Sequence, residues 1–339
     1  MKTKLKEKLI IISITTIIIS VVNLLLFPHL LKTEEPMPDN EAVGTSPSAT
    51  ENYQSALLQE NQPLISTTLS EPISIPMTVD ISSPYAGLYN LSTGATMYEK
   101  SAESRIHPAS LTKLLTAITA LNYLAPDTVI TVGTELELLP KRSSLCLIKK
   151  GHRLTLYDLL TGMLVASGND AAYTIAVNTA RSILNQVDIS DKEALSYFTE
   201  LMNSTAKTIG CTKSKFTTPD GFDSEEQYTT IRDLMLICDY ALNFKEIREI
   251  TSTVKKKVVF ESGENITWSN SNKLLHQESA YYYKHAIGMK TGTTPLAGLC
   301  LASVADINGQ TYLAVVCGCK SENDRYLSSI KLFDFASSI

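Results

Sequence analysis

His107-Pro108-Ala109-Ser110-Leu111-Thr112-Lys113-Leu114-Leu115-Thr116-Ala117 is the stretch of this 339-residue chain that decides its fold. Its proline suits the start of a helix, and the leucines after it form an apolar stripe typical of a central, buried helix. Ser110 and Lys113 are three residues apart, so both project from one side of the first helical turn. The stretch therefore predicts a hydroxyl and an amine held together at the tip of a core helix.

Two shorter signatures follow in a fixed order, Ser167-Gly168-Asn169 and then Lys290-Thr291-Gly292. Each signature alone has a purely structural explanation. Ser110 could be a helix cap, Ser167-Gly168-Asn169 a turn, and Lys290-Thr291-Gly292 the end of a strand. Together they supply a nucleophile with a nearby amine, a second hydroxyl with an amide, and a cationic strand edge. The ordered set predicts acyl transfer through a covalent serine ester.

Periodicity and turn residues outline the folded part of the chain. We expect strands over 85–90 and 95–99, a helix from about 110, and further helices over 155–164, 170–184, 191–209 and 230–242. Strands over 297–305 and 310–316 meet at Asn308-Gly309, a strong hairpin signal, and a helix over 322–336 closes the chain. The order predicts an α/β (α+β) fold, with an antiparallel sheet lobe built from both ends of the chain, flanking helices and a helical lobe. The three signatures would meet at the seam between the lobes.

The catalytic residues that we predict are Ser110, Lys113 and Ser167. Ser110 at a helix tip is the nucleophile, but its hydroxyl needs a base. Lys113 can be that base when burial and a second cation, Lys290, push it toward neutrality. Ser167 offers a hydroxyl that can relay a proton to the leaving nitrogen.

The substrate-binding residues that we predict lie in the second and third signatures. Asn169 can hold a substrate amide or Lys113, while Lys290 and Thr291 can bind a terminal carboxylate. Gly292 would leave room for a substrate backbone beside its strand, and the N–H of Thr293 could complete an oxyanion hole with that of Ser110.

At these residues the chain resembles the low-molecular-weight penicillin-binding proteins of the D-alanyl-D-alanine carboxypeptidase family, over about residues 80–337. The resemblance implies a β-lactamase/transpeptidase-like fold, removal of the terminal D-alanine from peptidoglycan stem pentapeptides, and acylation of Ser110 by β-lactam antibiotics such as penicillins. It also implies the roles argued above for six residues: Ser110, Lys113, Ser167, Asn169, Lys290 and Thr291. Gln227 departs from the pattern, since relatives often have histidine there. Many relatives also carry a C-terminal β-domain and membrane anchor, and we expect the N-terminal segment to replace that anchor.

The start of the chain differs in kind from the rest. Lys2, Lys4, Lys6 and Lys8 precede an apolar run over residues 9–27, which as a helix would be about 28 Å long and could span a membrane. We expect residues 1–8 to be a cytoplasmic tail, 9–31 an uncleaved transmembrane anchor, 32–76 a disordered, proline-containing linker, and 77–339 an extracytoplasmic catalytic domain at the cell membrane. A cleaved signal segment, which would release the enzyme, is the alternative.

Composition and cysteine spacing narrow the remaining possibilities. The net charge of −5 and the absence of a basic stripe give no support for nucleic-acid binding, and the five histidines and six cysteines lack paired metal-ligand spacing. We therefore expect no metal and no cofactor. If Asn308-Gly309 is a two-residue turn, Cys300 faces Cys317; we expect two buried thiols there, with a disulfide as the alternative.

Two rival functions remain open. A serine β-lactamase shares the three signatures but needs a glutamate in a loop to activate the deacylating water. Glu200-Leu201-Met202-Asn203 superficially resembles such a loop, yet its surroundings favour an amphipathic helix. The second rival is a non-catalytic wall-binding protein with the same fold, and the intact serine and lysines argue against it.

Overall fold

The computed structural model describes residues 79–339. The predicted cytoplasmic tail (1–8), anchor or signal segment (9–31) and linker (32–76) lie outside the described residues, as do the first two residues of the predicted catalytic domain. None of the helices in the described part is long and apolar enough to cross a membrane.

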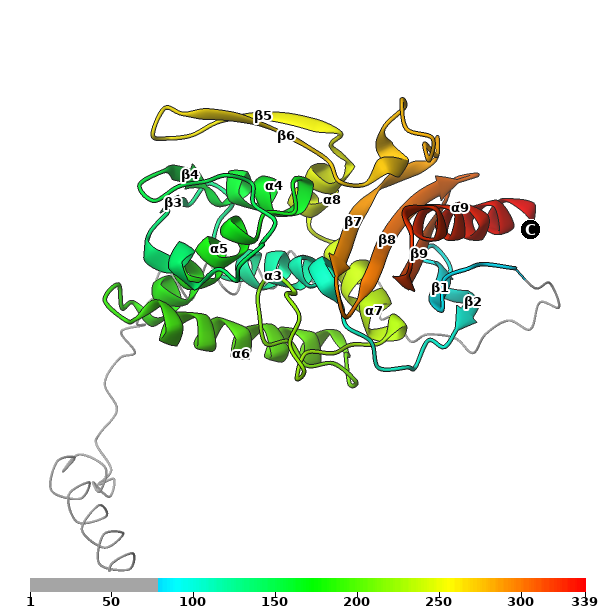
Figure 1. Ribbon diagram of the computed structural model, residues 1–339, viewed down its shortest axis with the longest axis horizontal. Helices are drawn as coiled ribbons and strands as arrows, with labels where there is room; N and C mark the ends of the chain where they lie inside the picture. The colour runs from blue at the N-terminus through cyan, green and yellow to red at the C-terminus, as the bar shows by residue number, and fades with distance from the viewer. Residues whose placement is uncertain (1–78) are drawn as a thin grey trace, which may run out of the picture. The chain divides into compact units, whose positions relative to one another are not determined.

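One lobe is built on a five-stranded antiparallel sheet whose strands lie in the order β2-β1-β9-β8-β7 (Figure 1). Because β1 pairs with β9, the beginning and the end of the described chain share one sheet, as predicted. The strands are β1 (Tyr85–Asn90), β2 (Ala95–Lys100), β7 (Ala286–Thr294), β8 (Gly298–Ile307) and β9 (Gln310–Cys319).

The hairpin between β8 and β9 confirms the two-residue turn. Ile307 pairs with Gln310, and Asn308 and Gly309 both have positive φ (53° and 76°), as this kind of turn requires. The register holds as far as Leu301 and shifts beside Cys300. The Cys300 and Cys317 thiols contact each other through a hydrogen bond, and all six cysteines are free. The pair is therefore two buried thiols, as expected, without a disulfide.

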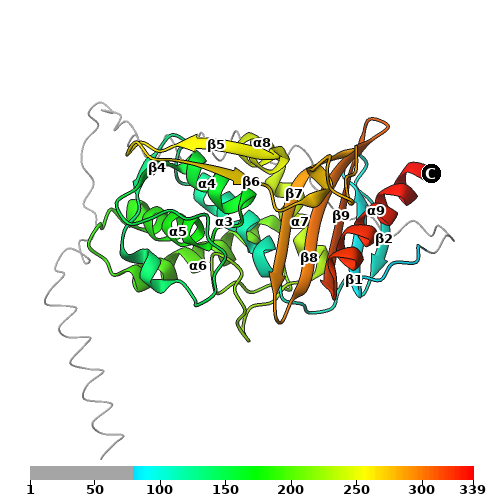
Figure 2. The ribbon, with the colours of Figure 1, turned by 45° about the horizontal axis from the view of Figure 1, so that its top comes forward.

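Helices cover both faces of this sheet (Figure 2). Helix α9 (Glu322–Ser338) packs on β8 and β9 over a cluster of buried apolar side chains that includes Leu301 and Phe333. On the opposite face lie α7 (Ile231–Ala241) and α8 (Lys245–Ser252), with α7 against β1 and β9 and α8 against β7. The sheet is thus a buried layer that can hold a side chain on β7 in a fixed position.

The helical lobe packs around α3 (Thr112–Leu121), in which every residue is buried. The surrounding helices are α4 (Leu156–Val165), α5 (Asn169–Leu184) and α6 (Asp191–Ile209). Thr155 and Ser190 cap α4 and α6 by accepting hydrogen bonds from the backbone N–H groups of Asp158 and Glu193. The predicted helix 191–209 is confirmed, and Glu200 lies exposed within it rather than in a loop.

Several short elements were not predicted. They are β3 (Val129–Thr131) with β4 (Arg153–Thr155), β5 (Lys255–Val259) with β6 (Asn265–Ser269), helix α8, and the 3₁₀ turns η2 (Ala109–Leu111), η3 (Thr134–Leu138) and η4 (Lys273–Leu275). Strand β5 begins with three lysines, which hide the alternation of polar and apolar residues that identifies a strand from sequence.

Candidate active site

Ser110 lies in the 3₁₀ turn η2, one turn before α3, where the sequence predicted the start of an α-helix. The turn begins with Ala109 in a left-handed conformation (φ 47°), which a residue with a side chain rarely adopts. Strand β7 passes close beside it: a Cβ added to Gly292 would lie 3.0 Å from the Ser110 nitrogen. Glycine at position 292 therefore lets β7 lie close beside the serine.

Lys113 is completely buried and reaches back to Ser110 from the first turn of α3. Its Nζ donates hydrogen bonds to Ser110 Oγ (2.8 Å), Asn169 Oδ1 (2.8 Å) and the carbonyl oxygen of Asp220 (3.0 Å). All three acceptors are neutral oxygens, so nothing in direct contact compensates a positive charge on the amine. This arrangement brings the predicted nucleophile, base and amide into one group.

Ser167 and Asn169 lie at the junction between α4 and α5. Ser167 adopts φ 60°, a strained conformation for a non-glycine residue that costs on the order of 1–3 kcal/mol. The N-cap of α5 is Gly168, so Asn169 and Asp170 both lie inside the first turn of the helix. There Asn169 is free to point at Lys113 because its side chain caps nothing.

Asp170 holds this junction against the preceding loop. Its carboxylate accepts hydrogen bonds from the backbone N–H groups of Cys146 (2.9 Å) and Ile148 (3.2 Å). The carbonyl of Cys146 in turn accepts from the indole of Trp268 (2.8 Å), and a Cβ on Gly168 would lie 2.6 Å from the Cys146 sulfur. A buried carboxylate, an indole and a glycine thus fix the position of Ser167 and Asn169.

Lys290 reaches the same group of side chains from β7 and is also completely buried. Its Nζ donates to Ser167 Oγ (2.9 Å) and to the carbonyl of Thr291 (3.0 Å). The two lysines therefore each hold one of the two serines, Lys113 with Ser110 and Lys290 with Ser167.

Both amines lose protons more readily than an ordinary lysine. Burial lowers the pKa of Lys113 to about 8, against an upward pull from the carboxylates of Asp220 and Asp170. Burial also lowers the pKa of Lys290 well below its ordinary value, and the neighbouring charges of Lys113 and Arg325 lower it further. We expected burial and the charge of Lys290 together to lower the pKa of Lys113. Burial is the main cause, and the charge repulsion acts instead on the pKa of Lys290, which the charge of Lys113 lowers.

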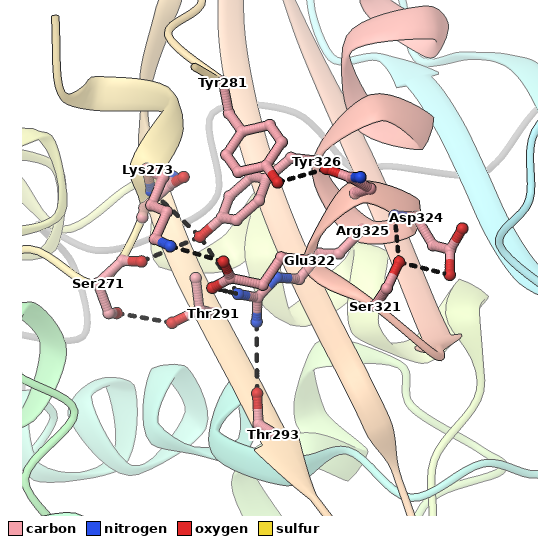
Figure 3. A network of polar contacts seen from close by, with 12 residues as sticks. Ser271, Lys273, Tyr281, Thr291, Thr293, Ser321, Glu322, Asp324, Arg325 and Tyr326 are labelled. Carbon is pink, nitrogen blue, oxygen red and sulfur yellow. Dashed lines mark hydrogen bonds and ion pairs between the residues drawn. The ribbon is translucent and has the colours of Figure 1, made fainter. Parts of the chain in front are cut away.

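The open edge of β7 carries the next two predicted residues. Thr291 Oγ1 and Ser271 Oγ share a hydrogen bond of 2.6 Å, and Thr293 Oγ1 accepts one from Arg325 Nη1 (3.3 Å). Figure 3 shows Arg325 reaching this strand from α9 while Ser271 faces Thr291. Arg325 is buried, with 5% of the residue exposed, and its guanidinium packs over the ring of Tyr326 and bonds to Glu322. Two hydroxyls and a fixed cation thus line one stretch of the strand.

Sequence reasoning missed Arg325, Asp220 and Ser271, and it left Gln227 without a role. Gln227 is buried: its Oε1 accepts from the backbone N–H groups of Thr217 and Thr218, and its Nε2 donates to the carbonyl of Phe222. It thereby closes the loop that presents the carbonyl of Asp220 to Lys113. The Asp220-Gly221 pair was a usable sequence signal for a tight turn at this point. In the structure the turn packs so closely that a Cβ on Gly221 would lie 1.8 Å from the carbonyl oxygen of Ala109.

Within residues 79–339, no group of three or more histidine, cysteine, aspartate or glutamate side chains is arranged to hold a metal ion. The groups that converge on the cleft are two serines, two depressed-pKa lysines, an asparagine and two threonines. That set, on a sheet lobe packed against a helical lobe, is typical of the class of serine-acylating enzymes that use a lysine as base.

Comparison with known proteins identifies the family. The sequence profile of the D-alanyl-D-alanine carboxypeptidases, peptidase family S11, matches residues 67–321. Because the match covers most of the chain, the chain belongs to this family.

Curated relatives agree with this assignment. The chain is 27% identical over 256 residues to D-alanyl-D-alanine carboxypeptidase DacF of Bacillus subtilis and 31% identical over 254 residues to DacC of Escherichia coli. These alignments cover 75% and 72% of this chain and 61% and 58% of the relatives, so the chain spans about three-fifths of their length. The carboxypeptidase of Streptomyces sp. K15 is 29% identical over 255 residues, which are 73% of this chain and 84% of that protein.

The solved structures point to the same fold. The Streptomyces K15 DD-transpeptidase superposes on 78% of this chain and all of its own, with a TM-score of 0.71 and 27% sequence identity. Penicillin-binding protein D2 of Listeria monocytogenes, solved with ampicillin bound, has a TM-score of 0.61 over 76% of this chain and 98% of its own at 24% identity, which indicates a shared fold. The predicted β-lactamase/transpeptidase-like architecture is confirmed.

Proposed function

We propose that this chain is a serine D-alanyl-D-alanine carboxypeptidase that removes the terminal D-alanine from peptidoglycan stem pentapeptides and is acylated by β-lactams. The observation that carries the proposal is the contact of 2.8 Å between the buried Lys113 amine and Ser110 Oγ. An amine with a pKa of about 8 is a substantial fraction neutral at physiological pH, so it can accept the proton of the serine hydroxyl.

Acylation follows from the arrangement of the side chains. The substrate peptide lies along β7 with its terminal carboxylate near Thr291, Thr293 and Arg325, where a fixed cation and two hydroxyls can bind it. Lys113 takes the proton of Ser110, and Ser110 Oγ forms a bond to the carbonyl carbon of the penultimate residue. The N–H groups of Ser110 and Thr293 are suited to hold the oxyanion, which typically lowers the barrier by about 3 kcal/mol per donor.

Breakdown of the intermediate uses the second serine. The Ser167 hydroxyl, bonded to Lys290 Nζ at 2.9 Å, passes a proton to the amide nitrogen as the C–N bond breaks, and D-alanine leaves as an amine. Water then hydrolyses the ester on Ser110: its hydroxide part joins the acyl carbon, and its remaining proton restores the Ser167 hydroxyl. Lys113 returns the proton that it took to Ser110 Oγ, which leaves as the hydroxyl. A β-lactam would acylate the same oxygen by opening its ring.

The experiment is release of D-alanine from a stem pentapeptide by the wild type, Ser110→Ala and Lys113→Ala. We expect both variants to lose turnover by at least about 10³-fold. Turnover by Ser110→Ala at a wild-type rate would contradict the proposal. Rapid multiple turnover of nitrocefin by the wild type, without D-alanine release, would indicate a β-lactamase instead; the exposed position of Glu200 on α6 gives that alternative no support.

We further propose that the catalytic domain is extracytoplasmic and anchored through residues 9–27, as the basic flank and apolar run predict. Peptidoglycan stem peptides lie on that side of the membrane, so the location and the substrate agree.

A further inference from the structure

Two segments that are far apart in the sequence lie side by side over helix α4. A Cβ added to Gly162 in this helix would lie 2.9 Å from the Cys146 sulfur and 3.1 Å from the ring of Trp268. Cys146 belongs to the loop that precedes β4, Trp268 belongs to β6, and the Trp268 indole donates a hydrogen bond to the Cys146 carbonyl (2.8 Å). Both segments therefore point buried side chains at the same part of α4. Figures 1 and 2 show the β5–β6 ribbon over α4, with α6 on the opposite side of the lobe.

The loop before β4 turns alternate side chains away from α4. Leu145, Leu147 and Lys149 are exposed, whereas Cys146 and Ile148 between them are buried. The leucines at 145 and 147 are 46% and 62% exposed, which is high for large apolar residues.

Strand β5 turns a similar set of side chains outward, because successive residues of a strand point to opposite faces. Lys255, Lys257 and Val259 are exposed, whereas Val258 is buried. Their partners across the ribbon are exposed and uncharged: Ser269, Thr267 and Asn265. We call the six outward residues of the two segments the outer face: Leu145, Leu147, Lys149, Lys255, Lys257 and Val259.

The outer face carries positive charge. Within residues 79–339, its three lysines take part in no ion pair. Segments 145–153 and 255–269 together contain six lysines and arginines but only two glutamates, although the whole chain has a net charge of −5. The backbone N–H of Arg153 donates to Ser262 Oγ (3.0 Å), so the two segments also meet at the turn of the ribbon, where both glutamates lie.

One exposed leucine of the outer face is held in a strained conformation. Leu147 has φ 70°, in the left-handed region that residues with a side chain rarely adopt. Backbone strain of this kind is found mainly at functional sites. Here the strained loop holds a large apolar side chain in water, and contact with a partner would bury it.

We propose that the outer face docks on the surface of an anionic phospholipid membrane. Lysines beside exposed leucine and valine side chains are typical of surfaces that lie in a membrane interface. The lysines bind phosphate headgroups, and the apolar side chains enter the boundary with the acyl chains. A soluble polyanion would attract the lysines alone and leave three apolar side chains in water, so the membrane accounts for more of the face. The inference goes beyond the proposed reaction and rests on the proposed anchor, which keeps the domain near the lipid.

The outer face adjoins the candidate active site. The carbonyl of Ser144, one residue before Leu145, accepts a hydrogen bond from the backbone N–H of Asn169 (2.7 Å). Docking therefore holds the catalytic serine near the membrane surface. Residues 32–78 separate the proposed span from the domain and reach at most about 155 Å when extended, which is longer than a domain of this size is wide.

The test uses the full chain in lipid nanodiscs, with an environment-sensitive dye on an introduced cysteine. All six native cysteines are buried, so the dye reacts selectively with Thr267→Cys, opposite Lys257, or with Ser196→Cys on α6, since both positions are exposed. We expect a blue shift at position 267 in phosphatidylcholine discs that contain phosphatidylglycerol, and no shift there in discs of phosphatidylcholine alone. The dye at position 196 should not shift in either kind of disc.

Variants separate the charged and apolar parts of the outer face. Lys255→Gln with Lys257→Gln should lower the ratio of docked to undocked protein by about 25-fold, or about fivefold per lysine, and high salt should act in the same direction. Leu147→Ser should lower the ratio by about fivefold. Lys192→Gln with Lys207→Gln, two exposed lysines of α6, is the control and should change it by less than about twofold. All variants should react with fluorescent penicillin as the wild type does, which shows that they are folded.

The outcomes separate this inference from the proposed function. No shift at position 267 in anionic discs, or an equal shift in neutral discs, would overturn the inference. Salt-sensitive binding of soluble polyphosphate without a shift in discs would assign the lysines to a polyanion instead. A chain that enters neither kind of disc would overturn the proposed anchor; mixed with anionic vesicles, the same labelled chain then tests the face, and an absent shift overturns it too. Release of D-alanine in detergent tests the proposed reaction separately.

Discussion

Two lysines without exposure to solvent lie at the centre of the proposed active site, and each bonds to one of the two proposed catalytic serines. A buried ammonium is costly because the protein interior solvates charge poorly. The chain accepts that cost at Lys113 and Lys290, and adds backbone strain at Ala109 and Ser167. At the scale of single residues, reactivity is maintained at the expense of stability.

Replacement of Lys113 by methionine tests this cost. Depression of the Lys113 pKa from 10.5 to about 8 corresponds to about 3 kcal/mol of lost stability at neutral pH. The variant loses the amine's hydrogen bonds, so we expect a net gain of about 1–3 kcal/mol in unfolding free energy at pH 7, together with loss of activity.

The pH dependence of this gain has a defined sign. Between about pH 8 and 10.5 the folded state binds fewer protons at Lys113 than the unfolded state does. The stability lost by burying this lysine is therefore at its full size below about pH 8, the pKa in the folded state. The loss disappears as the pH rises to 10.5, the ordinary pKa of lysine. Denaturation at several pH values should show the gap between wild type and variant narrowing over this window. Lys245→Met, at an exposed lysine, serves as the control and should change stability by less than about 0.5 kcal/mol. A variant that is less stable at pH 7 would contradict the account.

At the scale of elements, the site depends on tight approaches between backbone segments. Strand β7 lies against the turn η2 at Gly292, and the loop through Gly221 lies against the same turn at Ala109. The Gly221 loop presents the carbonyl of Asp220 to Lys113 and is tied together by Gln227. These contacts set the distance between the serine and its base.

Gly221→Ala and Gly263→Ala form a matched pair that tests the backbone approach. Both glycines have positive φ (80° and 99°), so alanine costs about 1–2 kcal/mol at either position. Gly263 has open space where the methyl group would lie, whereas at Gly221 it would overlap the carbonyl of Ala109. We expect Gly221→Ala to lower the free energy of unfolding, measured by chemical denaturation, by about 1–3 kcal/mol more than Gly263→Ala does, and to slow acylation. Equal losses for the two variants would show that the approach is unimportant.

The sequence predicts the site better where a motif is local than where a contact is distant. Ser110 with Lys113 and Ser167 with Asn169 follow from spacing along one helix or junction, and the Asn308-Gly309 turn was sufficient to set the register of β8 and β9. Arg325 could not be predicted in this way, since its partner Thr293 lies 32 residues away on a different element. Nor could spacing reveal that Gly292 faces the backbone of Ser110, because that contact depends on how the sheet packs against the helical lobe. The three lysines of β5 hide the local pattern of a strand. This strand forms because of its tertiary packing, which the sequence alone does not show.

At the scale of the molecule, the cleft joins the two lobes: Ser110, Lys113, Ser167 and Asn169 come from the helical side, and residues 290–293 come from the sheet. All of them fall within residues 79–339. The proposed catalytic residues therefore all lie outside the N-terminal segment, whose proposed role is to attach the enzyme to the membrane.

Cell fractionation of the full chain and of residues 79–339 tests this division. We expect the full chain to remain with membranes and to be released by detergent, while the fragment stays in the aqueous fraction, and both to react equally with fluorescent penicillin. N-terminal sequencing of the mature protein decides the alternative. A mature start downstream of residue 31 would indicate a cleaved signal segment and contradict the anchor.

The most direct test of the whole account is the site of covalent attachment after exposure to benzylpenicillin. Mass spectrometry of the intact protein and of its proteolytic peptides should find one penicilloyl group per chain, on Ser110, and none in Ser110→Ala. An adduct on Ser167, or no adduct on a folded wild-type chain, would contradict the claim that the Lys113 amine activates Ser110.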